Sequence, residues 1–254
     1  MQLTAIVLTK NEENTIADCI ESLLFCDQIL IVDDESADRT VDVIKNLNNP
    51  KVHVRVHPLD NDFAKQRNFA LTQVVGDWIL FVDADERVSE ELASEIKNII
   101  NQESAHEGYY IKRDDYLWGE KMQKGETGNI KLLRLVRKGA GKWMGKVHET
   151  LRVSGSTYIL ANPLMHYPHQ NLSEFLREVN TYSTFRAEEL FEKKVRTNLF
   201  FIIAYPKIKF IKNYFVLSGY KDGVPGFIHA IVMSFHSFLV RAKLYLLWKG
   251  IKNS

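Results

Sequence analysis

The stretch ILFVDADERVSEEL, residues 79–92, passes from an apolar run directly into two carboxylates and then into a helical pattern. Asp83 and Asp85 are separated only by Ala84. Like charges this close repel each other unless a cation lies between them, and a hard divalent ion with oxygen ligands is the usual partner. The stretch therefore predicts a buried strand, a helix beginning near Ser89, and a metal site between them. The alternative for the pair taken alone is an exposed turn that caps the helix.

The same alternation of strand and helix occurs three times before this stretch. Each unit joins an apolar or β-branched run to a segment with apolar residues at helical spacing. The units are 3–9 with the helix after it, 28–34 with 38–47, 52–56 with 62–74, and 77–85 with 89–100. Four such units in about a hundred residues imply a largely parallel, doubly wound sheet with helices on both faces. Right-handed crossovers then place the carboxyl ends of the four strands at one edge.

Polar residues follow the first two strands at this edge, where open α/β sheets bind their ligands. Thr9, Asn11 and Glu12 come after the first strand, and Asp33 and Asp34 after the second. Such acids can accept hydrogen bonds from a ribose or a nucleobase. Each residue alone is more often a cap or a turn residue, but together they predict a nucleotide pocket.

The phosphates of that nucleotide would need a metal. Neither GxxxxGK[ST] nor GxGxxG follows any strand, so backbone cradles of those kinds are absent from the sequence. Mg²⁺ or Mn²⁺ held by one or two carboxylates usually completes its shell with water and substrate phosphates. The sequence therefore predicts a diphosphate bound through Asp83 and Asp85.

The second half of the chain changes character. Short alternating strands and turns follow residue 105 and predict a mixed sheet, and a charged helix runs over 173–196. From Lys207 onward there are seven Lys and one Arg against the single acid Asp222, a net charge of +7. Basic residues interleaved with aromatic ones are typical of a helix at an anionic bilayer surface. A helical pair packed on the domain is the alternative, and the 18 uncharged residues 223–240 are borderline for a membrane span.

Composition narrows the class of protein. The chain has 254 residues, 45% hydrophobic and 26% charged, which is typical of a globular protein and excludes wholesale disorder. Cys19 and Cys26 lack metal-site spacing and are too few for a disulfide framework. This cysteine content predicts that the protein resides in a reducing compartment, the cytoplasm.

The N-terminal motifs resemble those of family 2 glycosyltransferases with the GT-A fold, in order and spacing over residues 3–100. The segments that carry the resemblance are TAIVLTKNEENTIADCIESL, ILIVDDESADRTVDVI, DFAKQRNFAL and WILFVDADERV. The later segments KWMGKVHETL and GYKDGVPGF resemble the lipopolysaccharide inner-core β-glucosyltransferase subgroup. The resemblance implies an α/β fold with a Rossmann-like, mostly parallel sheet flanked by helices and a C-terminal helical extension.

This resemblance also implies a division of the chain. A GT-A domain would occupy 1–170, with a nucleotide-sugar-binding half over 1–105 and an acceptor half over 106–170. The remaining residues, 171–254, would form a helical, membrane-associating region.

Site roles implied by the resemblance follow position by position. Asp83 and Asp85 match the DXD motif, in which the second Asp is usually the more direct metal ligand. His166 could reach this metal, since GT-A enzymes often add a downstream His, whereas His148 could orient the acceptor or Glu149. The remaining residues would bind the nucleotide sugar: Thr9, Asn11, Glu12 and Asp33 or Asp34 at the base and ribose, and Lys65, Arg67 and Asn68 near the sugar or diphosphate. One departure is that Glu35 and Ala37 replace the Gly and Thr of the usual VDDGSTD.

The implied reaction needs a base. An acceptor hydroxyl would attack the anomeric carbon opposite the leaving diphosphate and invert its configuration, while a carboxylate removes the proton. Glu149, in KVHETL, is our choice because it matches the family's His-Glu pair. Asp114, Asp115 and Glu120 compete for this role, and a surface salt bridge is the ordinary alternative for each.

The whole sequence thus predicts an inverting, metal-dependent hexosyltransferase. It would use Mg²⁺ or Mn²⁺ and a nucleoside diphosphate sugar, with uracil as the expected base, and act on a saccharide or glycolipid acceptor of the bacterial envelope, such as lipopolysaccharide core. We expect a cytoplasmic protein at the inner face of the cytoplasmic membrane, with no nucleic-acid partner.

Three other functions fit parts of the pattern. A sugar-phosphate nucleotidyltransferase should carry a Gly-rich loop after the first strand, and LTKNEEN contains no Gly. A HAD-type phosphatase should carry its Asp-x-Asp after the first core strand and not in the fourth unit. A membrane-bound scaffold that binds nucleotide without turnover stays open.

Overall fold

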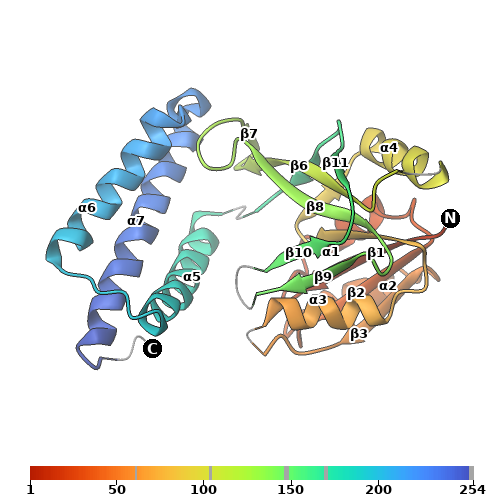
Figure 1. Ribbon diagram of the computed structural model, residues 1–254, viewed down its shortest axis with the longest axis horizontal. Helices are drawn as coiled ribbons and strands as arrows, with labels where there is room; N and C mark the ends of the chain where they lie inside the picture. Colours follow the sequence, from red (N-terminus) through yellow and green to blue (C-terminus); the bar gives the residue numbers. More distant parts are fainter. Residues whose placement is uncertain (61, 103–104, 146–148, 169–170, 252–254) are drawn as a thin grey trace. The chain divides into compact units, whose positions relative to one another are not determined.

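The computed structural model describes residues 1–60, 62–102, 105–145, 149–168 and 171–251. These residues form two compact units, Met1–Arg113 with Lys131–His166, and Asp114–Ile130 with Tyr167–Ser254. Figure 1 shows the course of the chain through both. The division at residue 170, with halves meeting at 105, stays a prediction.

The first unit is built on a mixed sheet with strand order β3-β2-β1-β4-β8-β6-β12-β5, to which β11 is added beside β6. The pairs β1–β2, β1–β4 and β2–β3 are parallel, and β4–β8 and β12–β5 are antiparallel. The strands are β1 Leu3–Thr9, β2 Gln28–Asp33, β3 Val52–Val56, β4 Trp78–Asp83, β5 Glu86–Val88, β6 Gly108–Leu117, β8 Ile130–Arg137, β11 Thr157–Ile159 and β12 Leu164–His166. A separate two-stranded sheet joins β9 Gly141–Met144 to β10 Thr150–Val153. The α/β prediction with parallel strands first and a mixed second half is confirmed.

Helices bury both faces of this sheet. They are α1 Ile16–Ser22, α2 Thr40–Asn46, α3 Phe63–Thr72 and α4 Glu90–Asn101. Ile20 and Ile96 belong to the cluster on one face of the central strands, and Ala70 packs with Phe81 on the other. Burying a side chain of the size of Ile or Phe contributes about 1.5–3 kcal/mol, so both clusters stabilise the sheet whose strand ends carry the polar residues. Ser89 caps α4 as predicted, because its Oγ accepts from Leu92 N at 3.2 Å.

One element between the two carboxylates and the helix was not predicted. Residues Glu86–Val88 form β5, which pairs antiparallel with β12 so that His166 lies opposite Glu86. This pairing joins positions about eighty residues apart and places His166 next to the end of β4.

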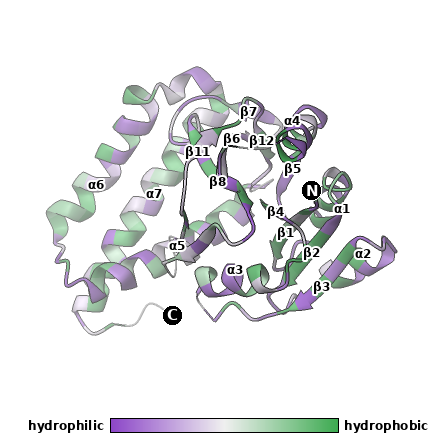
Figure 2. Ribbon diagram, turned by 45° about the vertical axis from the view of Figure 1, so that its right-hand side comes forward, coloured by the Kyte–Doolittle hydropathy of each residue, from purple (hydrophilic) through white to green (hydrophobic). Residues whose placement is uncertain are grey.

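The second unit consists of three long helices and a hairpin. They are α5 Leu172–Glu192, α6 Leu199–Ile211 and α7 Gly223–Trp248, with short helical turns at η1 Lys212–Val216 and η2 Gly219–Asp222, and with β7 Glu120–Met122 paired to the end of β6. Buried residues of α7 pack against α5, and Phe210 of α6 packs against Phe227 of α7. Figure 2 shows apolar residues along α6 and α7. Within the described residues, the helical stretch Gly219–Trp248 is long and apolar enough to cross a membrane. In an apolar segment of 18 residues within it, 28% is buried.

The GYKDGVPGF segment holds this unit together at the start of α7. A side chain at Gly226 would place its Cβ 2.1 Å from Gly219 O, so only glycine permits the two turns to approach. Asp222 accepts from Gln123 N at 3.2 Å and from Lys124 N at 2.8 Å, which ties the loop after β7 to α7.

Candidate active site

The carboxyl ends of β1, β2 and β4 lie next to one another. The register pairs Thr9 with Asp33 and Leu8 with Asp83. The residues predicted for the nucleotide and for the metal therefore begin at one edge of the sheet, as the order of strands and helices in the sequence indicated.

The loop after β1 is fastened to the loop after β2. Ala37 N donates to Asn11 Oδ1 at 2.8 Å, and Glu12 N donates to Thr40 Oγ1 at 2.7 Å. Thr9 Oγ1 is buried and has no hydrogen-bond partner among the described residues. Because a buried hydroxyl without a partner is costly, it marks a position that a bound ligand would complete.

Both carboxylates after β2 are buried and hydrogen-bonded. Asp33 accepts from Ser36 N at 3.0 Å, which closes the turn. Asp34 accepts from Lys10 Nζ and from Leu59 N, each at 2.7 Å. The two acids thus connect the loops after three strands.

Glu35 occupies the position at which the family that this sequence resembles usually has glycine. Its φ is +52°, in the left-handed region. That region costs a residue with a Cβ roughly 1–2 kcal/mol. The turn therefore has the shape that glycine favours, although this chain carries Glu.

Asp83 is held between two arginines. Its Oδ1 accepts from Arg67 Nη2 at 2.9 Å and its Oδ2 from Arg134 Nη2 at 2.5 Å. Arg134, only 3% exposed, also donates to Glu86 Oε1 at 2.7 Å, and Asp83 N donates to Glu86 Oε2 at 2.9 Å. Both oxygens of Asp83 therefore have cationic partners.

This network changes the ionisation of its members. Burial alone would raise the pKa of Asp83, but Arg134 and then Arg67 hold that pKa well below its usual range. Burial raises the pKa of Glu86, with Arg134 opposing the shift and Asp83 adding to it. Asp83 is therefore firmly ionised, and its charge is balanced within the protein.

Asp85 faces a different partner. Its Oδ2 lies 3.1 Å from His166 Nε2, and both side chains are partly shielded from solvent. The β5–β12 pairing produces this proximity. A carboxylate beside an imidazole fits a divalent ion, although the described residues contain no group of three or more His, Cys, Asp or Glu that could hold one.

Glu149 is connected to the same network through Arg67. Its Oε1 accepts from Arg67 Nε at 3.1 Å, and the Arg67 guanidinium lies over the Trp143 ring at 4.6 Å. Arg67 is itself buried, and its Nη1 has no hydrogen-bond partner among the described residues. One guanidinium thus joins Glu149, the carboxylate predicted as base, to Asp83.

The other predicted residues of α3 are engaged elsewhere. Asn68 Nδ2 donates to Trp143 O at 2.9 Å and Asn68 Oδ1 accepts from Trp143 N at 3.0 Å, so this side chain pins β9. Lys65 pairs with Asp60 at 3.1 Å on the surface. Of the three α3 residues, the described structure brings Arg67 to the carboxylates.

The competitors for the role of base lie in the second unit. Asp114 pairs with Lys121 at 2.6 Å, Asp115 is buried, and Glu120 is exposed. His148 lies outside the described residues. Of the four candidate acids, Glu149 is the one that belongs to the unit carrying Asp83 and Asp85.

Arg134 and Glu86 were missed from the sequence. Arg134 is the one charged residue inside the apolar run LLRLV of β8. A buried Arg is rarely found without an acid partner, so this interruption of an apolar run was the available signal. Glu86 gave no comparable signal, because in the sequence it follows DAD as one more acid before a helix.

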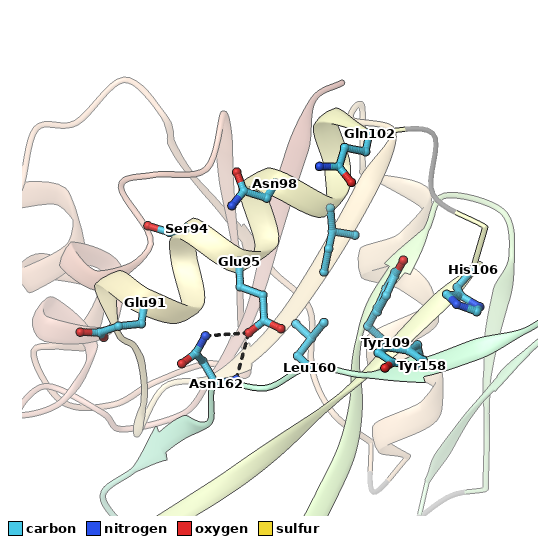
Figure 3. Close-up of a pocket in the computed structure, with 11 residues that line it drawn as sticks. Glu91, Ser94, Glu95, Asn98, Gln102, His106, Tyr109, Tyr158, Leu160 and Asn162 are labelled. Carbon is cyan, nitrogen blue, oxygen red and sulfur yellow. Dashed lines mark hydrogen bonds between the residues drawn. The ribbon is translucent and has the colours of Figure 1, made fainter.

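A hollow of ≈ 580 Å³ lies elsewhere in the first unit (Figure 3). None of the predicted site residues lines it. Glu95 of α4 closes one side by accepting from Ala161 N at 2.8 Å and from Asn162 Nδ2 at 2.8 Å. The other lining side chains include Ser94, Asn98, His106, Tyr109 and Tyr158. This hollow is separate from the carboxylate cluster.

Comparison with known proteins bears on the whole chain. The model of glycosyl transferase family 2 matches residues 4–148. The lipopolysaccharide core biosynthesis glycosyltransferase LpsC of Rhizobium meliloti (strain 1021) is 30% identical over 249 residues, covering 96% of this chain and 92% of the relative. The chain belongs to glycosyl transferase family 2.

Further relatives of this family 2 glycosyltransferase cover similar lengths. An uncharacterized glycosyltransferase of Rickettsia typhi (strain ATCC VR-144 / Wilmington) is 28% identical over 256 residues, 96% of this chain and 86% of that one. Among solved structures, S. aureus TarS 1–349 in complex with UDP-GlcNAc has a TM-score of 0.48 and 15% identity, and the match covers 100% of this chain and 93% of that 1–349 chain.

Family membership confirms the resemblance, the GT-A fold class and the assignment as a transferase. The matched region includes Thr9, Asp33, Arg67, Asp83 and Asp85. Residues after 148, among them the base candidate and His166, fall beyond it but within the alignment to LpsC, which covers nearly the entire chain.

Proposed function

We propose that this chain transfers a sugar, with inversion, from a nucleoside diphosphate sugar to a saccharide or lipid-linked acceptor in bacterial envelope glycan synthesis. The observation that carries the proposal is the convergence of three strand ends with Asp83, Asp85 and Glu149 in one unit of a family 2 glycosyltransferase. A lipopolysaccharide core acceptor is supported by the relative LpsC, whose name gives that pathway.

The donor would lie across the edge formed by β1, β2 and β4. Thr9, Asn11 and Glu12, with Asp33 or Asp34, are assigned to its base and ribose, and UDP is the expected nucleotide. The unpartnered Thr9 Oγ1 and Arg67 Nη1 supply donors that such a ligand would satisfy. Lys65 and Asn68 are assigned to the sugar or diphosphate, with Asn68 acting through its bonds to Trp143.

Asp85 and His166 would hold the divalent ion, Mg²⁺ or Mn²⁺. Oxygen and imidazole nitrogen ligands suit Mn²⁺, and a carboxylate suits either ion, so the pair fits the group. When bound, such an ion stabilises the charge on the departing diphosphate. Asp83, whose oxygens meet Arg67 and Arg134, is assigned to orienting this edge as well as to the metal shell.

Glu149 would accept the proton of the acceptor. The acceptor oxygen forms a bond to the anomeric carbon, the bond from that carbon to the diphosphate oxygen breaks, and the hydroxyl proton passes to the carboxylate. Arg67 Nε engages Oε1 of Glu149, so we assign the proton to Oε2. The same contact fixes the direction in which the carboxylate points.

The protein would work in the cytoplasm at the inner face of the bacterial membrane. The support is charge, because residues 193–254 contain eleven Lys and Arg and the single acid Asp222. An anionic leaflet attracts such segments at about 1 kcal/mol for each basic residue near the surface. The GT-A domain over 1–170 would thus be joined to a membrane-associating region over 171–254.

Mass spectrometry of products tests the proposal directly. The full chain is incubated with a panel of nucleoside diphosphate sugars, Mg²⁺ or Mn²⁺, and acceptors extracted from bacterial membranes. We expect a mass increase of one hexose or N-acetylhexosamine on a saccharide acceptor. Donors that bind without any product would support the non-catalytic scaffold instead.

A variant separates the metal role from binding of the nucleotide. Asp85→Ala should lower transfer by about 10²-fold or more, because the charge of the leaving diphosphate loses its counter-ion. Asp18→Ala, on the exposed side of α1, is the matched control and should keep full activity. Full transfer and donor hydrolysis by Asp85→Ala with metal present would remove this residue from the metal site.

A further inference from the structure

The helix α6 is apolar and yet exposed. None of its thirteen residues, LFFIIAYPKIKFI, all of which the structure describes, is buried. Phe200 is 69% exposed and Ile208 62%, and Ile211 and Phe215 beyond them are likewise exposed. Positions 200, 204, 208, 211 and 215 recur at helical spacing, so these side chains form one stripe along α6 and η1, which we call the outer stripe.

The opposite side of α6 is already occupied. Ser234 Oγ of α7 donates to Pro206 O at 2.8 Å, and the Arg241 guanidinium lies over the Tyr205 ring at 3.8 Å. Phe210 packs edge-on against Phe227. The outer stripe therefore faces away from the rest of the unit, and an apolar surface of this extent indicates an interaction site.

α7 adds a second apolar stripe to the same unit. Ile231, Phe235 and Phe238 follow one another at spacings of four and three residues, and each is exposed. Together with the outer stripe they add exposed apolar residues to two packed helices, α6 and α7, whose ribbons carry much of the hydrophobic colour in Figure 2.

Charge identifies the occupant as an anionic bilayer. Residues 193–221 contain seven Lys and Arg and no acid. Lys207 and Lys212 are exposed beside the outer stripe, whereas Lys209 is bound to Glu126. A second copy of this chain would bring the same basic surface against itself, which like charges oppose. An anionic lipid surface matches both the basic residues and the apolar stripe.

Whether α7 spans the bilayer or lies on its surface depends on α5, which packs against α7. Val240 and Leu244 are buried against Ala187 and Leu190 of α5. In the same part of α7, Lys243 Nζ lies within hydrogen-bond distance of Asn180 O, Asn180 Oδ1, Ser183 Oγ and Thr184 Oγ1.

A spanning α7 would carry α5 with it into the hydrocarbon core. That helix contains five Glu and two Arg, and charged side chains at membrane depth are costly. Although Gly219–Trp248 is long and apolar enough to span, its attachment to α5 opposes that arrangement.

We propose that α6 and the exposed face of α7 lie in the plane of an anionic bilayer surface, with the outer stripe among the lipid headgroups and acyl ends, and that no helix of the described residues spans the bilayer. This inference rests on the proposed function for its membrane partner and adds the contact surface and the depth. The basic residues around the stripe meet the headgroups, while α5 stays on the aqueous side.

Vesicle flotation tests the contact surface. The full chain is mixed with vesicles of phosphatidylcholine alone or of phosphatidylcholine with phosphatidylglycerol. We expect binding to the mixed vesicles, release at high salt, and a loss of at least about tenfold in the partition coefficient for Ile208→Asp. Val56→Asp is the matched control, because Val56 of β3 is also 62% exposed. Equal binding by Ile208→Asp and the wild type, or binding that ignores lipid charge, overturns the proposal.

Depth is tested with a polarity-sensitive dye on single added cysteines. Cys19 and Cys26 are buried, and burial raises the pKa of both thiols, so an exposed cysteine is labelled selectively. A dye on Ile208→Cys should report an apolar environment when mixed vesicles are added, and a dye on Glu188→Cys of α5 should stay in water. An apolar signal at both positions, with resistance to salt extraction, shows a span and overturns in-plane binding.

Two further measurements keep the outcomes separate. Light scattering of the wild type without lipid reports self-association, and a dimer abolished by Ile208→Asp would assign the stripe to a second copy and overturn the proposal. Release of nucleoside diphosphate in solution is assayed on the same variants. If the wild type shows no turnover, the proposed function fails, while the flotation result still decides whether the stripe binds lipid.

Discussion

The two compact units place charge and apolar surface in opposite ways. In the first unit, the central strands β1, β2 and β4 are covered, and charged side chains meet at the sheet edge, where the buried Arg134 binds both the buried Glu86 and the partly exposed Asp83. In the second unit, large apolar side chains of α6 are exposed and basic residues lie around them. A unit that gathers charge in its interior is suited to a charged, water-soluble ligand, and a unit that exposes apolar side chains is suited to a less polar surface.

The largest effect is expected from removing Glu149, the proposed general base of the first unit. Glu149→Gln keeps the shape and the Arg67 contact but cannot accept a proton. We expect kcat to fall about 10²–10⁴-fold with little change in the donor KM, because general base catalysis contributes about that much. Initial rates at varied donor concentration measure both constants. Glu120→Gln, in the second unit, should retain activity, and the reverse pattern would transfer the role of base to Glu120.

The buried charge network can be broken at Arg134. Arg134→Met leaves Asp83 and Glu86 without their shared partner, and removal of one member of a buried ion pair costs about 3–5 kcal/mol of unfolding free energy. Arg39→Met removes an exposed partner of Glu13 and should cost less than about 1 kcal/mol. Urea unfolding of both variants measures the difference. A cost below 1 kcal/mol for Arg134→Met would mean that the network does not stabilise the edge.

The second unit offers a milder ion pair for comparison. Burial would raise the pKa of Glu126, but its bond to Lys209 lowers the pKa below the ordinary value. A lowered folded pKa stabilises the protein above the unfolded value of about 4.3, and this stabilisation is lost as the pH falls through the folded value. Glu126→Gln should therefore lower the unfolding free energy by about 1 kcal/mol at pH 7, with the difference shrinking below pH 4. A difference that grows in acid would mean that the pKa of Glu126 is raised in the folded protein and not lowered.

The smallest expected effect concerns the turn at Glu35, in the first unit. Glu35→Gly relieves the left-handed conformation but loosens the unfolded chain, so we expect a net gain of at most about 1 kcal/mol. Glu91→Gly, in the first turn of α4, is the control and should destabilise by a similar amount. Thermal unfolding compares the two variants, and a loss of stability in Glu35→Gly would show that the Glu side chain has a role beyond the turn.

Sequence periodicity predicted the parallel part of the first unit well, because the pattern of each strand and helix lies within a short stretch of sequence. Each strand of the four strand–helix units is followed by the helix that covers it, and right-handed crossovers bring Thr9, Asp33 and Asp83 to one edge without knowledge of distant contacts. The placement of Asp85 near His166 could be suggested only through the family resemblance. It depends on β5 pairing with β12, and three-residue strands carry too little pattern to be recognised.

Long-range packing also explains what was missed. Arg67 was assigned to the sugar or diphosphate, yet in the structure it joins Asp83 to Glu149, residues 16 and 82 positions away. Arg134 meets Asp83 across 51 positions. No spacing rule in a single sequence connects such residues, because the sheet order that makes β8 the neighbour of β4 arises from tertiary assembly.

The attachment of Lys243 to α5 has a consequence for how the protein is made. If α6 and α7 lie in the plane of the bilayer as proposed, with Lys243 of α7 bound to polar atoms of α5, the helical unit would finish folding in water after release from the ribosome, without insertion machinery. Its arrival at the bilayer would then be reversible, so that the amount of enzyme stationed there follows the anionic lipid content of the leaflet and the ionic strength of the cytosol.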